Sequence, residues 1–427
     1  MENILNYFKK RYRNIAIATA TTMLVISLFI PHSQAINESP TFWQFTSADT
    51  MKYSRDTAGN PDSVKLIPRI IKEATDVNPT HISIATPYDE QFYPVLNAWV
   101  LEVRKYNKKV WFRGNFSSWE GWFGYTKFSD IYDHNKMTRA FILNHKDLFE
   151  DGDIFTPVPE PENGGLGDPR TSGEIAVKFN DFLVSSYQNC NKAFEEINKK
   201  VTCGYFSMNA DVAKQVLNET TVKGIGNVIA IDHYVADPMQ MEKDIDYLSQ
   251  KYDAKIVLGE YGAPIPDING QMTEVEQADF IGKLLNVLYL KREKIIGINY
   301  WVSTGGSTAL INDDGNPRMA AEIVKNYYLP PKVGGIITDP LGSHLKNVVI
   351  KDKENMTLAT TDNDGNFSFA ILKGSSLDIT ISNENYSTVT KTVSSDENNS
   401  SLSIILIPKN PDFLYILRYF FSHLQGK

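Results

Sequence analysis

The chain has 427 residues with a formal net charge of −8, and 42% of the residues are hydrophobic and 22% are charged. This composition is that of a globular protein, and it excludes wholesale disorder and a protein of many membrane spans. The length predicts two or three domains. The acidic balance argues against nucleic acid as a partner.

The first 35 residues have the pattern of an export signal. Four basic residues lie at positions 9–13, and a mostly apolar run follows at 15–30. Pro31 ends this run, and small residues at Ser33 and Ala35 fit a cleavage site. We expect cleavage after Ala35. The alternative is an uncleaved anchor, because the run is close to the shortest membrane span. Either way, we expect the remainder to be secreted or held at the extracytoplasmic surface of the cell.

The chain has two cysteines, too few for a scaffold built on disulfides. Cys190 lies in a long helical pattern, and Cys203 opens the next apolar run. An oxidising compartment would permit a disulfide between them. We expect two buried thiols instead, since free cysteine is among the most buried residue types.

Residues 36–330 have the pattern of eight strand–helix units. The expected strands are 42–46, 81–86, 109–114, 153–160, 202–208, 227–234, 255–262 and 295–303. The helical patterns begin near residues 63, 91, 136, 173, 211, 237, 273 and 319. Such alternation predicts an α/β protein with a parallel sheet, and eight units of this total length predict a (β/α)₈ TIM barrel. An open doubly wound sheet is the competing architecture, but its phosphate-binding glycine turn is missing, as is a Walker loop.

Active sites of such barrels lie at the carboxyl ends of the strands. Polar and aromatic residues collect at these ends: Arg113 and Asn115, followed by Trp119 and Trp122, after strand three; Glu160, Glu162 and Asn163 after strand four; Tyr234 after strand six; Glu260 on strand seven; and Trp301 on strand eight. Two carboxyl groups and aromatic walls suit the cleavage of a glycosidic bond. One acid protonates the leaving oxygen, while the other attacks the anomeric carbon or activates water. This chemistry requires no metal and no cofactor.

Several of these residues have a structural interpretation beside the functional one. Glu160 is preferred as the proton donor, but Glu162 stands in the same proline-rich stretch and stays open. Trp119 and Trp122 fit packing against the next helix as well as contact with a sugar. Arg113 fits an ion pair with a structural acid.

The strand ends resemble those of clan A retaining glycoside hydrolases, a large group of barrel enzymes that contains endoglucanases and mannanases. The resemblance covers about residues 41–328 and rests on the order and spacing of the motifs. It implies that Glu160 is the acid/base, that Glu260 is the nucleophile and that Tyr234 contacts the nucleophile. It also implies that Trp301 forms the floor of the sugar site.

One departure from the clan concerns the residue before the acid/base. The clan usually has an asparagine there, which bonds the sugar 2-hydroxyl, whereas this chain has Pro159. Asn163 or Asn115 would then take over that contact.

The expected function is a secreted glycoside hydrolase that cleaves β-glycosidic bonds of a polysaccharide or oligosaccharide by retaining double displacement. The alternative is a catalytically inactive barrel that binds glycan or serves as a structural protein of the cell surface. A metal hydrolase is disfavoured because the seven histidines form no pair with ligand spacing. A serine hydrolase is disfavoured because there is no Gly-x-Ser-x-Gly motif.

Residues 331–408 change to alternating, β-rich segments separated by turn residues, which predicts a small all-β sandwich. The segments at 335–339 and 361–367 and the pair Asn385-Tyr386 resemble the carboxypeptidase regulatory-like, transthyretin-type module. We expect a spacer or stabilising role for it. The tail at 409–427 contains an apolar stretch that is too short to span a bilayer. The two alternatives for this tail are docking on the protein and lying on a membrane surface. We expect association with a membrane or cell wall through the N-terminal segment or this tail.

Overall fold

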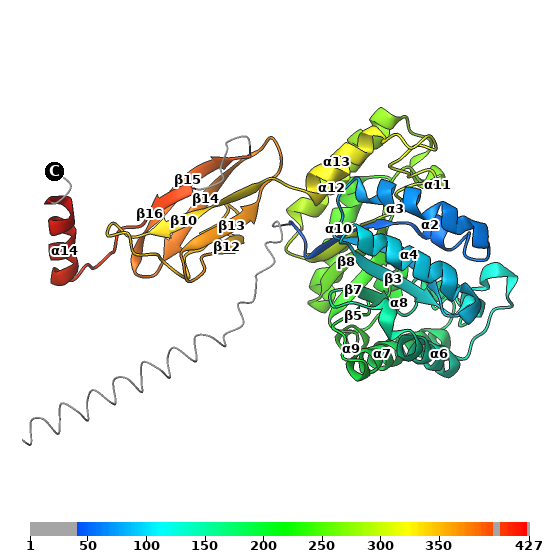
Figure 1. Cartoon of the computed structure of the whole chain (residues 1–427). Helices are drawn as coiled ribbons and strands as arrows, with labels where there is room; N and C mark the ends of the chain where they lie inside the picture. The colour runs from blue at the N-terminus through cyan, green and yellow to red at the C-terminus, as the bar shows by residue number, and fades with distance from the viewer. Residues whose placement is uncertain (1–40, 396–401, 425–427) are drawn as a thin grey trace, which may run out of the picture. The chain divides into compact units, whose positions relative to one another are not determined.

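The computed structural model describes residues 41–395 and 402–424. The expected export signal and its cleavage site lie outside these residues. The described chain contains an α/β barrel followed by two small β-sheets and a final helix (Figure 1).

The barrel is a parallel sheet in the order β5-β4-β3-β2-β1-β9-β8-β7-β6. Its strands are β1 (Phe45–Asp49), β2 (His81–Pro87), β3 (Lys109–Asn115), β4 (Ile154–Thr156), β5 (Thr202–Cys203), β6 (Met208–Asn209), β7 (Val228–Asp232), β8 (Lys255–Tyr261) and β9 (Ile295–Tyr300). The two end strands, β5 and β6, are consecutive in the chain and only residues 204–207 separate them. The fifth expected strand is therefore divided in two, and its continuity closes the sheet. The predicted barrel is confirmed.

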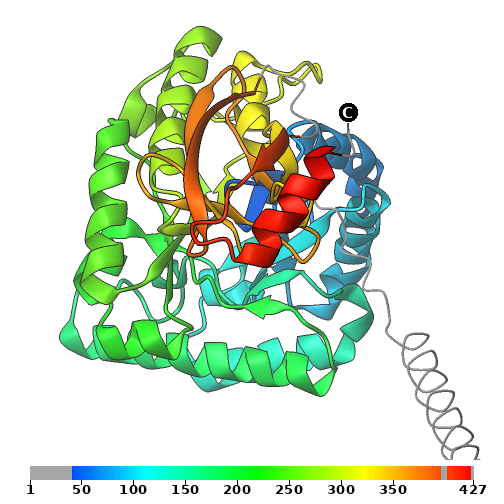
Figure 2. The ribbon, with the colours of Figure 1, turned by 90° about the vertical axis from the view of Figure 1, so that its left-hand side faces the viewer.

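The helices form an outer ring around the strands (Figure 2). They are α2 (Met51–Ser54), α3 (Ile67–Thr75), α4 (Tyr93–Lys105), α5 (Ser117–Glu120), α6 (Ile131–Asn144), α7 (Gly173–Glu196), α8 (Ala210–Val216), α9 (Glu219–Gly224), α10 (Pro238–Tyr252), α11 (Pro266–Asn269), α12 (Glu274–Leu290) and α13 (Met319–Tyr328). Each long helix buries one apolar stripe. In α4, for example, Val95, Trp99 and Val103 are buried at helical spacing.

Two strand boundaries differ from the sequence prediction, and both differences matter for the site. β1 begins three residues later than expected and continues to Asp49, because it pairs with β2 through Asp49↔Ser83. β4 ends at Thr156, four residues before Glu160. Pro157 and Pro159 follow it, and proline has no N–H to continue the ladder.

The side chains that point into the barrel form an apolar layer and, nearer the carboxyl ends of the strands, a polar layer. Phe45, Trp111, Ile154, Ala230 and Val257 form one apolar cluster. Residues two or four positions apart on a strand share a face. The apolar cluster therefore lies on the same inner face as the polar residues that follow it on β1, β3 and β7, and those polar residues lie nearer the carboxyl ends of the strands.

Two smaller sheets follow the barrel. One has the order β13-β10-β16 and the other β12-β11-β14-β15. Their strands are β10 (Lys332–Thr338), β11 (Val349–Lys351), β12 (Thr357–Thr360), β13 (Asn366–Ala370), β14 (Ser376–Asn383), β15 (Tyr386–Ser394) and β16 (Leu402–Ile405). Side chains from both sheets share one apolar core that includes Ile337, Ile350 and Ile381. The predicted all-β sandwich is confirmed as a fold.

Cys190 and Cys203 form a disulfide, so the expectation of two free thiols is wrong. α7 carries Cys190 and ends at Glu196, and the chain then turns back into β5, which carries Cys203. This turn places the two Cα atoms 6.2 Å apart, which is within the range that a disulfide bridges.

The final helix is α14 (Phe413–Leu424). Within the part of the chain that the structure describes, no helix is both long enough and apolar enough to cross a membrane.

Candidate active site

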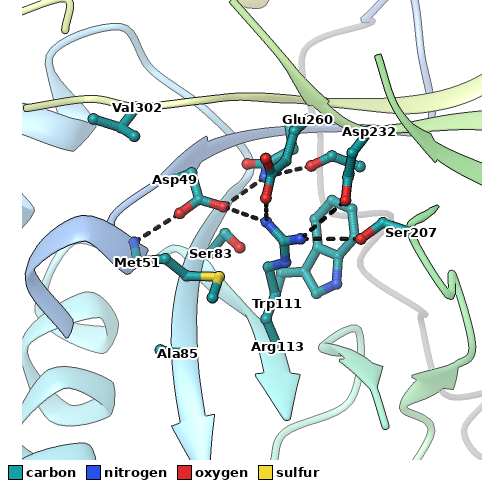
Figure 3. A network of polar contacts seen from close by, with 12 residues as sticks. Asp49, Met51, Ser83, Ala85, Trp111, Arg113, Ser207, Asp232, Glu260 and Val302 are labelled. Atoms are coloured by element: carbon teal, nitrogen blue, oxygen red, sulfur yellow. Dashed lines mark hydrogen bonds and ion pairs between the residues drawn. The ribbon is translucent and has the colours of Figure 1, made fainter. Parts of the chain in front are cut away.

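A buried arginine organises the carboxyl end of the barrel. Arg113 near the end of β3 is 1% exposed. Its Nη1 donates to Glu260 Oε1 at 2.5 Å and to Asp49 Oδ2 at 3.0 Å, and its Nη2 donates to Ser207 Oγ at 3.0 Å (Figure 3). Asp232 Oδ2 lies 3.6 Å from Nη2. Three carboxyl groups, from β1, β7 and β8, thus surround the guanidinium group of Arg113, and its hydrogen bonds go to protein side chains.

Glu260 is held from two sides. Arg113 binds one carboxyl oxygen, and Tyr234 Oη donates to the other at 2.7 Å. The pKa of Glu260 is raised to about 7. Burial is the largest cause, Arg113 opposes it, and the charge of Glu160 adds to it. Burial and the charge of Glu260 also raise the pKa of Tyr234, so this phenol keeps its proton as a donor. The carboxylate form of Glu260 is therefore oriented by two donors.

Gly259, the residue before Glu260, has no room for a side chain. A Cβ atom there would lie 2.3 Å from Ser207 Cβ and 2.5 Å from Asp232 Oδ1. Real Cβ atoms do not approach so closely, and glycine is the residue that permits a close approach of this kind. β7 and β8 are irregular at the same place, where Asp232 pairs with Glu260.

Asp49 and Asp232 were not selected by the sequence analysis as site residues. Asp49 Oδ2 accepts from Asn299 Nδ2 at 2.7 Å, and its Oδ1 accepts from the Met51 N–H at 2.7 Å. Burial and, after it, the charge of Glu260 raise the pKa of Asp232 well above its usual value, against the opposing effect of Arg113. Asp49 was missed because the sequence predicts that the first strand ends at residue 46, whereas β1 continues to Asp49.

The structure separates the two acids that the sequence left as alternatives. The charge of Glu160 raises the pKa of Glu260 and of Asp232. Glu162 is buried instead, and its Oε1 accepts from the Asn209 N–H at 2.6 Å. Burial raises the pKa of Glu162 to about 7. Glu162 is thus tied to the backbone of β6, whereas the charge of Glu160 acts on the cluster that contains Glu260 and Asp232.

Glu160 has an unusual backbone. It adopts a left-handed conformation with φ of 44° and ψ of 52°. Its N–H donates to the carbonyl of Ser207 at 2.7 Å, and its own carbonyl accepts from the Asn163 N–H at 2.9 Å. Non-glycine residues in this region are strained and cluster at functional sites.

The three tryptophans that the sequence predicts as sugar contacts, Trp119, Trp122 and Trp301, take different positions. Trp301 is half-buried and packs with Trp122, Met51 and Ala85 at the site end of the barrel. Trp119 is 0% exposed, and its ring packs against His134 and Phe182 with centroid distances of 4.9 and 4.8 Å. Trp119 therefore belongs to the core, while Trp122 and Trp301 form an aromatic wall.

The two asparagines differ, because within the described residues hydrogen bonds engage the side-chain amide of Asn115 but only the backbone of Asn163. The Asn115 side chain is buried, donates to Glu120 Oε1 through Nδ2, and lies 3.1 Å from His134 Nε2 through Oδ1. Asn163 is exposed, and its backbone carbonyl accepts from Lys127 Nζ at 2.6 Å.

Glu120 is a further acid that the sequence analysis missed. It accepts from Asn115 Nδ2 and, at 3.1 Å, from Trp122 Nε1. Burial, and after it the charge of Glu160, raises the pKa of Glu120 to about 8. At neutral pH, Glu120 is thus a mostly protonated carboxyl group beside Glu160. Its sequence signal was weak, because Glu120 lies at the end of the short helix α5, beyond β3, rather than at the strand end.

The comparisons with known proteins bear on the fold. No family model matches the sequence, and no curated protein matches it either. Among solved structures, GH5_18 from Streptomyces cattleya in complex with GlcNAc has a TM-score of 0.50 at 13% identity, covering 70% of this chain and 84% of that chain. The β-glycosidase BGL167 has a TM-score of 0.49 at 10% identity, with coverage of 68% and 96%. Exo-β-1,4-mannosidase Op5Man5 from Opitutaceae bacterium strain TAV5 has a TM-score of 0.49 at 10% identity, with coverage of 69% and 62%. The likeness to GH5_18 shows the fold.

Proposed function

We propose that the protein is a glycoside hydrolase that cleaves β-glycosidic bonds of a polysaccharide or oligosaccharide with retention of configuration. The observation that carries this proposal is the placement of Glu260 between Arg113 and Tyr234. The charge of Glu160 raises the pKa of the same Glu260 carboxyl group. One oriented carboxylate and one neighbouring acid at the carboxyl end of a barrel are the minimum that this chemistry needs.

The mechanism has two displacements. A Glu260 oxygen attacks the anomeric carbon while the bond to the leaving oxygen breaks, and that oxygen takes a proton from Glu160. Water then attacks the same carbon and gives a proton to Glu160, and the bond between the sugar and Glu260 breaks. Arg113 and Tyr234 favour the charged form of Glu260 that must leave in this second step. Trp301 and Trp122 offer aromatic faces on which a sugar ring stacks.

The proposed location is outside the cytoplasm, as a secreted protein or at the cell surface. The basic and apolar start of the sequence supports export. The Cys190–Cys203 disulfide supports it as well, since disulfides persist in oxidising compartments. In this proposal, the sandwich is a spacer or stabilising module of the carboxypeptidase regulatory-like type. The N-terminal segment or the C-terminal tail associates with the envelope.

A glycan screen tests the activity. Residues 36–427 would be assayed for reducing-sugar release from β-glucans, mannans, xylans and galactans. We expect Glu260→Gln to lose several orders of magnitude of the rate, because the nucleophile is removed while the shape is kept. Glu174→Gln on the exposed face of α7 is the matched control and should keep full activity. Product anomers followed by NMR should show retention.

Two results would overturn the proposal. Binding of a glycan without turnover in the wild-type chain would support the inactive, glycan-binding barrel instead. Turnover that survives in Glu260→Gln would remove the central assignment.

A further inference from the structure

The C-terminal helix α14 presents large apolar side chains to solvent. Phe413 is 74% exposed, Leu414 is 62% exposed and Ile416 is 52% exposed. Single exposed apolar residues are normal on a protein surface, but a contiguous group of them marks an interaction site. α14 therefore has the surface of an element that binds something else.

Helical spacing divides this segment into two faces. Leu417 lies four positions from Phe413 and three from Leu414, so these three exposed side chains form one apolar stripe. Tyr415 lies on the other side of the helix. Tyr415 is half-buried and its hydroxyl oxygen is buried, so the Tyr415 side of the helix is the one that meets the rest of the chain. The apolar stripe is left to another partner.

The charge of the tail differs from that of the rest of the protein. The whole chain has a net charge of −8, whereas residues 413–427 contain Arg418 and Lys427 and no acidic residue. Arg418 is exposed and lies four positions from Leu414, at the edge of the apolar stripe. A positive, aromatic and aliphatic helix in an otherwise acidic protein is complementary to a negatively charged lipid surface.

A second copy of the chain is a weaker candidate for the occupant. A helix of 12 residues is about 18 Å long and about 10 Å wide. One face of it is far smaller than the ~800 Å² per partner of a stable protein interface. A lipid surface has no such requirement, because an interfacial helix binds through its own buried stripe.

We propose that α14 is an interfacial helix that lies on an anionic bilayer, with its Phe/Leu stripe among the lipid headgroups and Arg418 at the phosphates. This inference deepens the proposed surface location and names its partner. It does not depend on hydrolysis, so a vesicle experiment and the glycan screen fail independently. It also gives the protein an attachment that survives removal of the N-terminal segment.

Vesicle co-sedimentation of residues 36–427 tests the proposal, since this form contains every described element. The vesicles would be phosphatidylcholine alone or phosphatidylcholine with 30% phosphatidylglycerol. We expect binding to the anionic vesicles, weaker binding to the neutral ones and no binding after truncation at residue 410. The double variant Phe413→Asp/Leu414→Asp should bind at least tenfold more weakly.

The matched control is Tyr132→Asp/Leu290→Asp. These two residues are 76% and 60% exposed on helices of the barrel, so the control introduces the same charges at similar exposure. It should bind vesicles as the wild-type chain does. No vesicle binding by the wild-type chain would overturn the proposal, and so would equal losses in the two double variants. A dimer that dissociates in Phe413→Asp/Leu414→Asp, with no affinity for vesicles, would assign the stripe to a second copy.

Discussion

The two acids of the candidate site are held by different kinds of structure. Glu260 lies within β8, and its two carboxyl oxygens accept from Arg113 and Tyr234. Glu160 lies beyond the short strand β4 and is fixed by backbone hydrogen bonds to Ser207 and Asn163. Side chains therefore fix the carboxyl group of Glu260, whereas backbone contacts fix only the position of Glu160.

This difference matches what each acid has to do. A nucleophile must present one oxygen in one direction, and an arginine and a tyrosine on opposite oxygens achieve that. A proton carrier must gain and lose a proton in each cycle. Within the described residues, the Glu160 carboxyl makes no ion pair, whereas Glu260 pairs with Arg113. A carboxylate held by side-chain contacts and one held only through its backbone can therefore share one site.

The largest expected effect distinguishes Glu160 from its neighbour. Glu160→Gln should lower the rate about 10²–10⁴-fold on natural glycosides, because the leaving oxygen loses its general acid. The loss should be much smaller on an aryl glycoside with an acidic phenol, whose departure needs no proton. Steady-state kinetics on both substrates measure this split.

Glu162→Gln is the matched control for that experiment. A glutamine Oε1 still accepts the N–H of Asn209, so this variant should keep most of the activity on both substrates. A loss in Glu162→Gln that depends on the leaving group, with Glu160→Gln unaffected, would move the acid/base by two residues.

The next largest effect concerns the arginine on the Glu260 side of the comparison. Arg113→Met leaves Asp49 and Glu260 buried without their cation. We expect a loss of about 3–5 kcal/mol in the free energy of unfolding at pH 7, measured by urea denaturation. The same change in a Glu260→Gln background should cost less, since one stranded charge is already gone.

Arg170→Met provides the surface reference for this cycle. Arg170 pairs with Asp168 in an exposed position, and such pairs contribute at most about 1 kcal/mol. Equal losses for Arg113→Met and Arg170→Met would show that the buried network does not stabilise the fold.

The regular parts of the fold follow from the sequence. The alternation of strand and helix patterns predicts the barrel, and Glu260 is found because a Gly-Glu pair ends a continuous apolar strand. These signals are local and repeat along the chain.

The missed features depend on contacts between distant residues. Asp49 joins the site because β1 pairs in a register set by β2, and no local pattern shows where that pairing stops. The disulfide depends on how the chain turns between α7 and β5. Glu120 lies on the short helix α5, and burial, which no local pattern shows, raises its pKa.

The smallest expected effect tests Glu120 through the pH dependence of stability. Its pKa is raised in the folded protein to about 8, so the folded state binds a proton more tightly than the unfolded state. The stability from this proton is fully present below the unfolded pKa of about 4.3 and is lost as the pH rises through 8. The free energy of unfolding should therefore fall from pH 5 to pH 8, with a contribution of a few kcal/mol from Glu120.

Glu120→Gln removes this titration and should flatten the fall, while Glu162 and Glu260 still contribute to it. A glutamine amide cannot accept from both Asn115 and Trp122. The variant therefore carries a constant penalty, and the slopes rather than the absolute values are compared. Glu174→Gln is the control, because Lys178 lowers the pKa of Glu174, whereas burial raises that of Glu120. If Glu120→Gln and Glu174→Gln show the wild-type slope in urea denaturation from pH 5 to 8, Glu120 does not hold a proton beside Glu160. The acidic cluster would then end at Glu160, Asp232 and Glu260.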